Sequence, residues 1–391
     1  MAQSAGAHDE YRAALALRHT SGLGPRCWSR LADYFGSLAS AAASARRWAA
    51  LGLATGRQEA AFSSREWKAP AEEEYQAARK HGLHAVTLTS PDYPAQLRRI
   101  PDPPVLLYYS GRLELLQGPC LAVVGARSCS RYGLLTARSI GEEVSRAGIT
   151  VVSGLADGID RQAHLGGLAG VGSTVAVLGC GLDRVYPQAN ADLYRSVAGQ
   201  GVIISELPPG SPPKASHFPV RNRIISGLSL GVWVVEAAKS SGSLITARLG
   251  VEQGREVFAL PGRITDTSFK GCNALIADGA HPVSGAECIL RELRYQFADA
   301  LREAEARSES PPAPPTGEPG EAAPEPVPVL DGDEGVLMSL LEYDQGRHVD
   351  EVIRASGLPG HRVSALLVAL EVRGLVRQWP GMYYTLAEHA G

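Results

Sequence analysis

The chain has 391 residues, of which 45% are hydrophobic and 6% aromatic, and its formal net charge is −3. This length allows two or three domains that each bury a core, and the near-neutral total gives no chain-wide basic field of the kind that attracts nucleic acid. Six cysteines without a C-x-x-C pair disfavour a structural zinc site or a disulfide framework, and the lack of a signal-like start or an 18-residue apolar run favours a cytoplasmic protein without membrane insertion.

The first part of the chain is predicted to be helical. Apolar residues recur at three-and-four spacing in YRAALALRHT and in SRLADYFGSLASAAASARRWAAL. The segment SGLGP (21–25) between them fits a helix-hairpin-helix, whose backbone N–H groups would contact DNA phosphate, and it fits an ordinary turn of small residues equally well. Residues 1–85 are therefore predicted to form a helical domain of the SAM or helix-hairpin-helix type.

Short runs rich in Val and Ile follow from residue 119, and each is succeeded by a helical segment. Continuous apolar strands that alternate with helices predict a mainly parallel, doubly wound sheet that is covered on both faces. The expected fold class is thus α/β, with an extended Rossmann-like domain over residues 86–295. The predicted strands are LAVVG (121–125), ITVVSG (149–154), STVAVLG (173–179), GVIISE (201–206), GVWVVEA (231–237) and EVFALPG (256–262).

The last part of the chain combines a linker with a small domain. Residues 296–328 are rich in Pro, Glu and Ala, a composition typical of an extended solvated linker. Residues 299–334 hold ten acidic side chains against two arginines, so the rest of the chain is net basic. Residues 329–391 read as three helices and a β-wing, a winged helix-turn-helix. Its second hairpin helix (359–373) offers only His361, Arg362 and Arg373, which favours docking over major-groove reading.

The loops after the predicted strands carry the polar chemistry. Ligands of a doubly wound sheet bind at the carboxyl ends of its strands, and nine cations gather there. SSGSLITA (240–247) is typical of a helix start with Ser241 or Ser243 as cap, and such a start suits phosphate. These cations are Arg127, Arg131, Arg161, Arg184, Lys214, Arg221, Arg223, Lys239 and Arg263.

The loops lack the usual sequence motifs for binding a nucleotide, and this bears on which phosphate-containing ligand they bind. Neither G-x-x-x-x-G-K-[ST] nor G-x-G-x-x-G is present, which disfavours an NTPase and a dinucleotide enzyme. Separated arginines and small-residue loops fit the backbone of a nucleic acid better than one nucleotide. Tyr132, Tyr186 and Phe218 lie in the same loops and either stack on bases or pack against the sheet.

Candidate catalytic residues are few. Asp160 and His164 lie four residues apart and could form an acid/base or metal pair, but no third ligand is evident. We predict structural roles, with Asp160 capping a helix and His164 hydrogen-bonded beneath the loop. Ser153 follows a strand without the G-x-S-x-G elbow. The sequence therefore predicts no catalytic residue, no metal ligand and no cofactor.

An ordered series of motifs over residues 90–285 resembles the DNA-processing protein A (DprA/Smf) family. The motifs include VVGARSCSRYG, VVSGLADGIDRQAH, FPVRNRIISGLS, VVEAAKSSGSLITA and GCNALIADGA. The resemblance implies an extended Rossmann fold that binds single-stranded DNA without catalytic turnover. It also implies a homodimer that loads RecA recombinase, alongside or in place of single-strand-binding protein, during natural transformation.

The resemblance also assigns residues. Ala126 and Gln188 depart from the family, where many members have Ser and several have a basic residue. The dimer surface is expected near 270–285, with Leu275 and Ile276 as candidates, although a core role suits both. The implied contacts to single-stranded DNA are Gly125, Arg127, Gly154, Phe218, Arg221, Asn222, Arg223, Lys239, Ser241, Gly242 and Ser243.

Two other functions stay open at this point. Phosphoribohydrolases of nucleoside monophosphates share a Rossmann-like fold, but their P-G-G-x-G-T-x-x-E loop has no counterpart with a Glu in SSGSLITA or LPGRI. A duplex-DNA-binding regulator could act through the winged helix, yet VSALLVALEV in the candidate recognition helix is mostly apolar.

Overall fold

The structure is a computed structural model, and it describes residues 2–296, 298, 333–341, 347–373, 375–379 and 382–386. These residues form two compact units, one within residues 1–312 and the other within 313–391, each around its own hydrophobic core. The acidic linker predicted over 296–328 lies almost wholly outside the described residues. The domain boundaries predicted at residues 85, 295 and 328 stay predictions.

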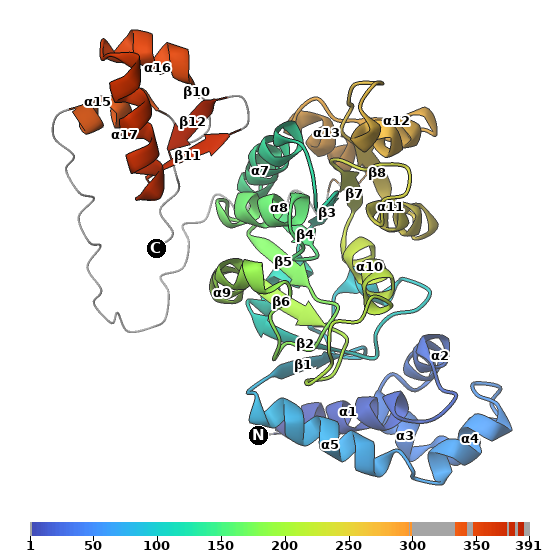
Figure 1. Ribbon diagram of the computed structural model, residues 1–391. Helices are drawn as coiled ribbons and strands as arrows, with labels where there is room; N and C mark the ends of the chain where they lie inside the picture. The colour runs from blue at the N-terminus through green and yellow to red at the C-terminus, as the bar shows by residue number, and fades with distance from the viewer. Residues whose placement is uncertain are drawn as a thin grey trace. The chain divides into compact units, whose positions relative to one another are not determined.

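A nine-stranded sheet forms the centre of the first unit, with the strand order β1-β2-β6-β5-β4-β3-β7-β8-β9 (Figure 1). Strands from β6 to β9 in this order are parallel, and β1 and β2 pair antiparallel at one edge. All six predicted strands are present, which confirms the doubly wound, mainly parallel sheet. The bounds are β1 His84–Thr87, β2 Leu106–Gly111, β3 Cys120–Val124, β4 Thr150–Ser153, β5 Thr174–Val177, β6 Val202–Ser205, β7 Gly231–Val234, β8 Glu256–Ala259 and β9 His281–Pro282.

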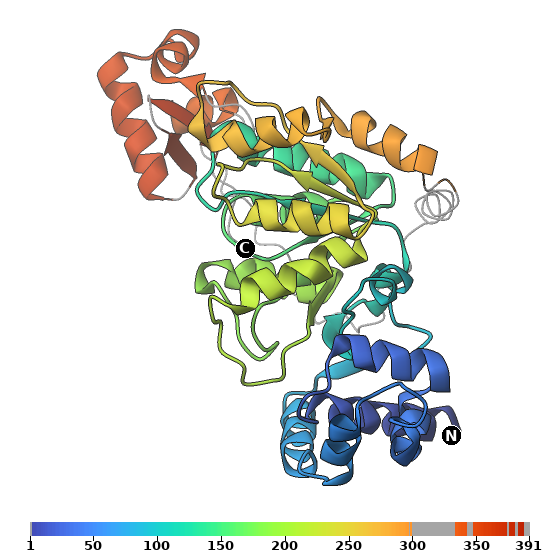
Figure 2. The ribbon, with the colours of Figure 1, turned by 90° about the vertical axis from the view of Figure 1, so that its right-hand side faces the viewer.

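The central strands are apolar throughout because helices cover both faces of the sheet. Every residue of β3, β4, β5, β6 and β7 is buried, as expected for parallel strands between two helical layers. One layer contains α7 (Arg131–Arg146), α8 (Ile159–Leu168) and α9 (Ala191–Gln200), and the other contains α10 (His217–Leu228) and α11 (Ser243–Glu252) (Figures 1 and 2). The remaining helices of this region are α12 (Lys270–Ala277) and α13 (Ala286–Gln296), with 3-10 turns at Leu113–Gln117, Gln188–Asn190 and Thr267–Phe269.

The predicted N-terminal helices are also present, and they pack beside the antiparallel edge of the sheet (Figure 1). Their apolar side chains belong to the same hydrophobic core as those of the sheet, and polar contacts add to this packing. The hydroxyls of Tyr11 and Tyr108 lie 3.1 Å apart, and Tyr108 donates to Glu74 over 2.7 Å. The segment SGLGP joins the first two helices. These helices are α1 (Ala2–Arg18), α2 (Pro25–Phe35), α3 (Leu38–Ala43), α4 (Gly56–Ser63) and α5 (Lys68–Lys80), with a 3-10 turn at Ala45–Arg47. The short α6 (Ala95–Arg98), between β1 and β2, was not predicted and contacts α10.

The second unit is a winged helix, as the sequence predicts. Its helices are α15 (Asp333–Leu340), α16 (Val349–Ser356) and α17 (Gly360–Val372). Strands β10 (Arg347–His348), β11 (Val376–Trp379) and β12 (Tyr383–Leu386) form a three-stranded sheet in the order β10-β12-β11. Across both units, every helix in the described ranges is too short or too polar to cross a bilayer.

Candidate nucleic-acid interface

The site forms where the strand order of the sheet reverses. From β3 the chain adds β4, β5 and β6 on one side and then crosses back to place β7 on the other side of β3. The loops that leave the carboxyl ends of β3 and β7 therefore diverge into opposite helical layers. This reversal leaves a crevice between them, the usual ligand position in a doubly wound sheet.

Glu236, two residues after the end of β7, links these two loops. Its side chain is only 1% exposed, and its carboxylate accepts hydrogen bonds from the backbone N–H of Ser130 (3.0 and 3.1 Å) and from the Ser130 hydroxyl (2.7 Å). Its carbonyl oxygen accepts from the Ala126 N–H over 2.8 Å. The backbone on both sides of the crevice is thus held in place without a ligand. The buried acidic side chain in VVEA was the sequence signal for this role, because such a group requires partners.

A cavity of about 300 Å³ opens at this crevice. A smaller one of about 50 Å³ adjoins it and shares Arg127, Phe218 and Arg221 with it, and Gly154 lines the smaller one. Nine of the eleven residues expected to contact DNA therefore lie together, whereas Lys239 and Arg223 line neither cavity. The predicted residues around the larger cavity are Gly125, Arg127, Phe218, Arg221, Asn222, Ser241, Gly242 and Ser243.

Arg127 is the accessible cation of the site. Its side chain is exposed, and its guanidinium carbon lies 5.8 Å from the centre of the Phe218 ring. No hydrogen bond or ion pair engages it within the described residues. Arg127 can therefore meet an anion without first breaking another polar contact.

Arg221 is a buried charge at the base of the cavity. It is 8% exposed, one of its terminal nitrogens donates to the Val177 carbonyl, and its Nε has no hydrogen-bond partner. Burial lowers the pKa of Arg221 to about 10, a shift that the nearby Asp160 carboxylate opposes and the Arg127 charge reinforces. A buried charge with an unpaired donor is costly, and because Arg221 lines both cavities, an anion bound there would offset the charge of its guanidinium.

The glycines of the site make room for neighbouring side chains. A Cβ on Gly154 would overlap the guanidinium of Arg221, and a Cβ on Gly125 would overlap the side chain of Ile159. Gly158 has φ +76°, a conformation that favours glycine, and its Cα faces the carbonyls of Ala126 and Arg127. The absence of a side chain at Gly154 thus leaves room for the guanidinium of Arg221, and its absence at Gly125 leaves room for the side chain of Ile159.

Arg223 does not share the position of Arg127 and Arg221. Its Nε lies 3.2 Å from Asp102, and one terminal nitrogen donates to both oxygens of Glu206 at 2.7 and 2.8 Å. With 7% exposure, this guanidinium meets carboxylates of its own chain. The expectation that Arg223 holds a phosphate beside Arg127 and Arg221 is therefore not supported by its geometry.

Helix α11 starts at the cavity, but its cap differs from the predicted one. Gly242 occupies the N-cap position and makes no side-chain cap bond. The hydroxyls of Ser241 and Ser243 lie 2.7 Å apart, and the Ser241 hydroxyl accepts from the N–H of Ser243 over 3.4 Å, although neither serine occupies the N-cap position. The positive end of the helix dipole still faces the cavity that these residues line. Lys239, on the loop just before, is exposed.

Asp160 and His164 are both used inside the structure. Asp160 accepts from the N–H of Gly154 (3.1 Å) and of Ala156 (3.4 Å), so it holds the preceding loop, and the prediction that it caps α8 is wrong. His164 accepts from the Leu155 N–H at Nε2 (3.2 Å), and its Nδ1 lies 2.7 Å from the Thr174 hydroxyl. The predicted position of His164 beneath the loop is confirmed, and burial lowers its pKa to about 3.

The three aromatic residues combine packing with exposure. Tyr186 lies 5.6 Å from Phe218 between ring centres and Tyr132 lies 5.9 Å from Phe269. Even so, Tyr186 is 38% exposed and Tyr132 is 51% exposed. Tyr186 also lines the smaller cavity together with Phe218. A surface for an unpaired base is therefore present directly beside Arg127.

Two further surfaces were predicted, a dimer surface on α12 and a docking surface on the winged helix. Leu275 and Ile276 on α12 are partly buried and pack against the main core, which fits the core role, and a dimer contact through them stays a prediction. In the winged helix, Arg362 and Arg373 of the candidate recognition helix form ion pairs with Asp333 (3.2 Å) and Glu334 (2.7 Å) of α15. These pairs engage two of the three donors that major-groove reading would use.

Two family models and several known proteins match this chain. The model of the family described as "DNA recombination-mediator protein A" matches residues 84–294, and that of the "DprA winged helix domain" matches residues 321–382. DNA processing protein DprA of Streptococcus pneumoniae is 45% identical over 203 residues, which cover 52% of this chain and 72% of that protein. Protein Smf of Synechocystis is 35% identical over 396 residues, which cover 95% of this chain and 97% of that protein.

Two solved structures are similar as well. DNA processing protein A of Streptococcus pneumoniae superimposes with a TM-score of 0.61 at 36% identity, over 71% of this chain and 95% of that one. DNA processing protein A of Helicobacter pylori gives a TM-score of 0.50 at 28% identity, over 55% of this chain and 97% of that one, and its structure was described for its single-stranded DNA binding mode.

Proposed function

This chain belongs to the DNA recombination-mediator protein A (DprA/Smf) family, and from that premise we propose that it binds single-stranded DNA across the cavities between β3 and β7. The observation that carries the proposal is the pair of guanidinium groups there. Arg127 is exposed and unpaired within the described residues, and the buried Arg221 has an Nε without a partner. Two such cations on one cavity favour successive phosphates.

The surroundings support a single strand over a duplex. The α11 N-terminus and the exposed Lys239 add positive charge beside the cavity. The Tyr186–Phe218 pair offers a ring surface to a base that is not stacked in a helix. The candidate recognition helix of the winged helix offers few donors for duplex reading, and Arg362 and Arg373 already lie in surface ion pairs.

We further propose that the protein is a recombination mediator without catalytic turnover. The polar atoms of Asp160 and His164 form hydrogen bonds with backbone N–H groups and a hydroxyl, which fits a structural role for both residues. In the proposed function a homodimer presents the bound strand to RecA recombinase in the cytoplasm, alongside single-strand-binding protein, during natural transformation. A RecA filament assay on strand coated with single-strand-binding protein tests this step. RecA assembly at the same rate with and without the chain would contradict it.

The DNA-binding proposal is tested by titrating labelled single-stranded oligonucleotide and matched duplex against the full chain at several salt concentrations. We expect a preference for the single strand that weakens in Arg127→Ala. Arg195→Ala is the matched control, because Arg195 is an exposed cation of α9 outside both cavities. An equal loss of affinity for single-stranded DNA in both variants would mean that only the net charge of the protein matters. Release of free base from nucleoside monophosphates would favour the phosphoribohydrolase function instead.

A further inference from the structure

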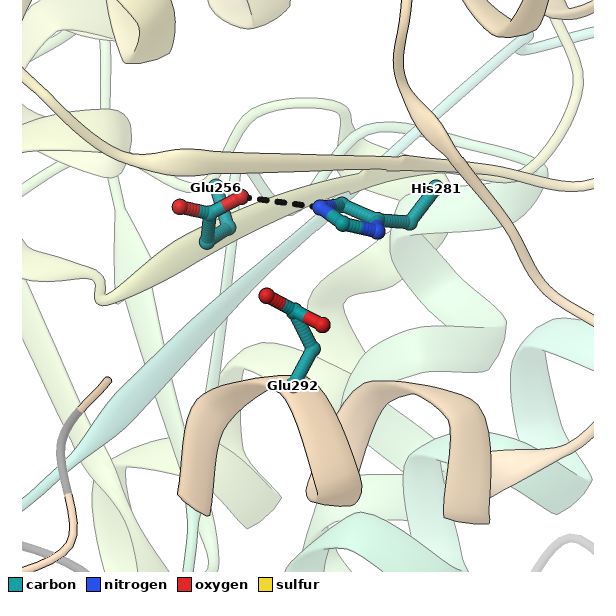
Figure 3. A group of neighbouring side chains, drawn as sticks. All are labelled: Glu256, His281 and Glu292. Atoms are coloured by element: carbon teal, nitrogen blue, oxygen red, sulfur yellow. Dashed lines mark hydrogen bonds and ion pairs between the residues drawn. The ribbon is translucent and has the colours of Figure 1, made fainter. Parts of the chain in front are cut away.

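Three side chains of types that can bind a metal lie together at the amino ends of β8 and β9, away from the proposed DNA site at the carboxyl ends of β3 and β7. Glu256 is the first residue of β8, His281 is the first of β9, and Glu292 lies on α13 (Figure 3). In Figure 3 the two carboxylates and the imidazole point toward a common space. Glu256 pairs with Gly231 at the start of β7, whereas the DNA cavity opens at the carboxyl ends of β3 and β7. The two sites are therefore separate.

The distances within this cluster suit one small cation. His281 Nε2 lies 3.0 Å from Glu256 Oε2, and one ligand atom from each of the three residues falls within 4.8 Å of the others. Ligands at 2.0–2.2 Å around a tetrahedral zinc ion are about 3.4 Å apart. Small side-chain rotations would bring the three atoms to that spacing. The His281 ring rests 5.4 Å from the Phe258 ring between centres, which restricts its orientation.

The charges of the cluster are incompletely balanced. Glu292 makes no hydrogen bond or ion pair within the described residues, and His281 is the one side chain that pairs with Glu256 there. All three side chains are partly buried. A single imidazole can carry at most one positive charge, so two carboxylates this close still repel each other. A divalent cation would offset both.

We propose that Glu256, His281 and Glu292 bind one divalent transition-metal ion, with Zn²⁺ as the best match. One imidazole nitrogen and two carboxylate oxygens form a donor set that zinc accepts, with water in the remaining position. The ligands come from two neighbouring strands and a covering helix. The bound ion would therefore fasten the short edge strand β9 and helix α13 to β8.

The test is a titration of the full chain with Zn²⁺ against a chromophoric chelator. We expect one ion per chain and at least about a tenfold loss of affinity in Glu292→Gln and in His281→Ala. Glu292→Gln is the decisive variant, because the replaced carboxylate has no partner within the described residues and its loss removes no existing contact. At one fixed concentration of Zn²⁺, the thermal midpoint of the wild type should rise by more than that of Glu292→Gln.

Two controls lie on the same helix. Glu287→Gln removes an exposed carboxylate of the first turn of α13, and Cys288→Ser removes a partly exposed thiol; neither should change the affinity for Zn²⁺. Binding that is unchanged in Glu292→Gln, or lost in Cys288→Ser, would overturn the proposed ligand set. Binding of single-stranded DNA, measured for each variant, should match the wild type and serves as the check on folding.

Discussion

Replacing Arg127 should weaken binding of single-stranded DNA, whereas replacing Arg223 should lower the stability of the protein, although the two residues look alike in the sequence. Arg127→Ala removes an exposed cation without a hydrogen-bond or ion-pair partner in the described residues. The free energy of unfolding should therefore change by no more than about 0.5 kcal/mol. Loss of one phosphate contact lowers the slope of log affinity against log salt by about 0.7.

That slope translates into a measurable ratio. Between 50 and 200 mM salt, a fourfold change, the Arg127→Ala variant should lose about 2.6-fold less affinity for single-stranded DNA than the wild type. The assay is fluorescence anisotropy with a labelled oligonucleotide at four or more salt concentrations. A denaturant melt of each protein accompanies it.

Arg223→Ala should act on stability instead. It leaves Glu206 and Asp102 without their cation, and Glu206 is only 20% exposed. Breaking such a partly buried pair should cost about 3 kcal/mol. Any distortion of the nearby cavity would lower the affinity at every salt concentration and leave the slope unchanged. A reduced slope in Arg223→Ala at unchanged stability, or an unreduced slope in Arg127→Ala, would refute the division of roles between the two arginines.

Three further outcomes follow from the geometry. Gly154→Ala places a Cβ on the guanidinium of Arg221, so the guanidinium must move and the affinity for single-stranded DNA should fall; an affinity equal to that of the wild type would mean that this position of the guanidinium is not needed for binding. His164 is buried with its pKa lowered to about 3, so below pH 6.5 its side chain takes up a proton in the unfolded chain and not in the folded one. The contribution of His164 to stability is therefore complete above pH 6.5 and falls by about 1 kcal/mol per pH unit between pH 6 and 4. His164→Asn should flatten this pH dependence in urea melts, and an equally steep curve in the variant would exclude His164 as its source. Truncation after residue 312 should leave binding of single-stranded DNA intact, because both cavities lie in the first unit, and abolished binding in a folded truncation would locate the site in the winged helix.

Local patterns in the sequence were sufficient for the framework of this protein. The six strands are continuous apolar runs, and a parallel strand buried on both faces needs such a run wherever it lies. The glycine- and arginine-rich loops follow these strands directly, so their position at one edge of the sheet comes with the fold. Nine of the eleven contact residues that the family resemblance implied also meet around two adjoining cavities.

Tertiary structure decided which charges meet, and that is where the sequence-based predictions were incomplete. Arg221 and Arg223 are two residues apart on α10, yet one faces the cavity and Asp160 whereas the other pairs with Asp102 and Glu206. Ser241 and Ser243 both have the chemistry of a cap, and the chain places Gly242 there. Glu256, His281 and Glu292 show no ligand spacing along the chain and converge only when β8, β9 and α13 pack together. A periodic pattern records the burial of a residue, but an ion pair or a ligand set depends on side-chain directions that are set only when distant segments pack.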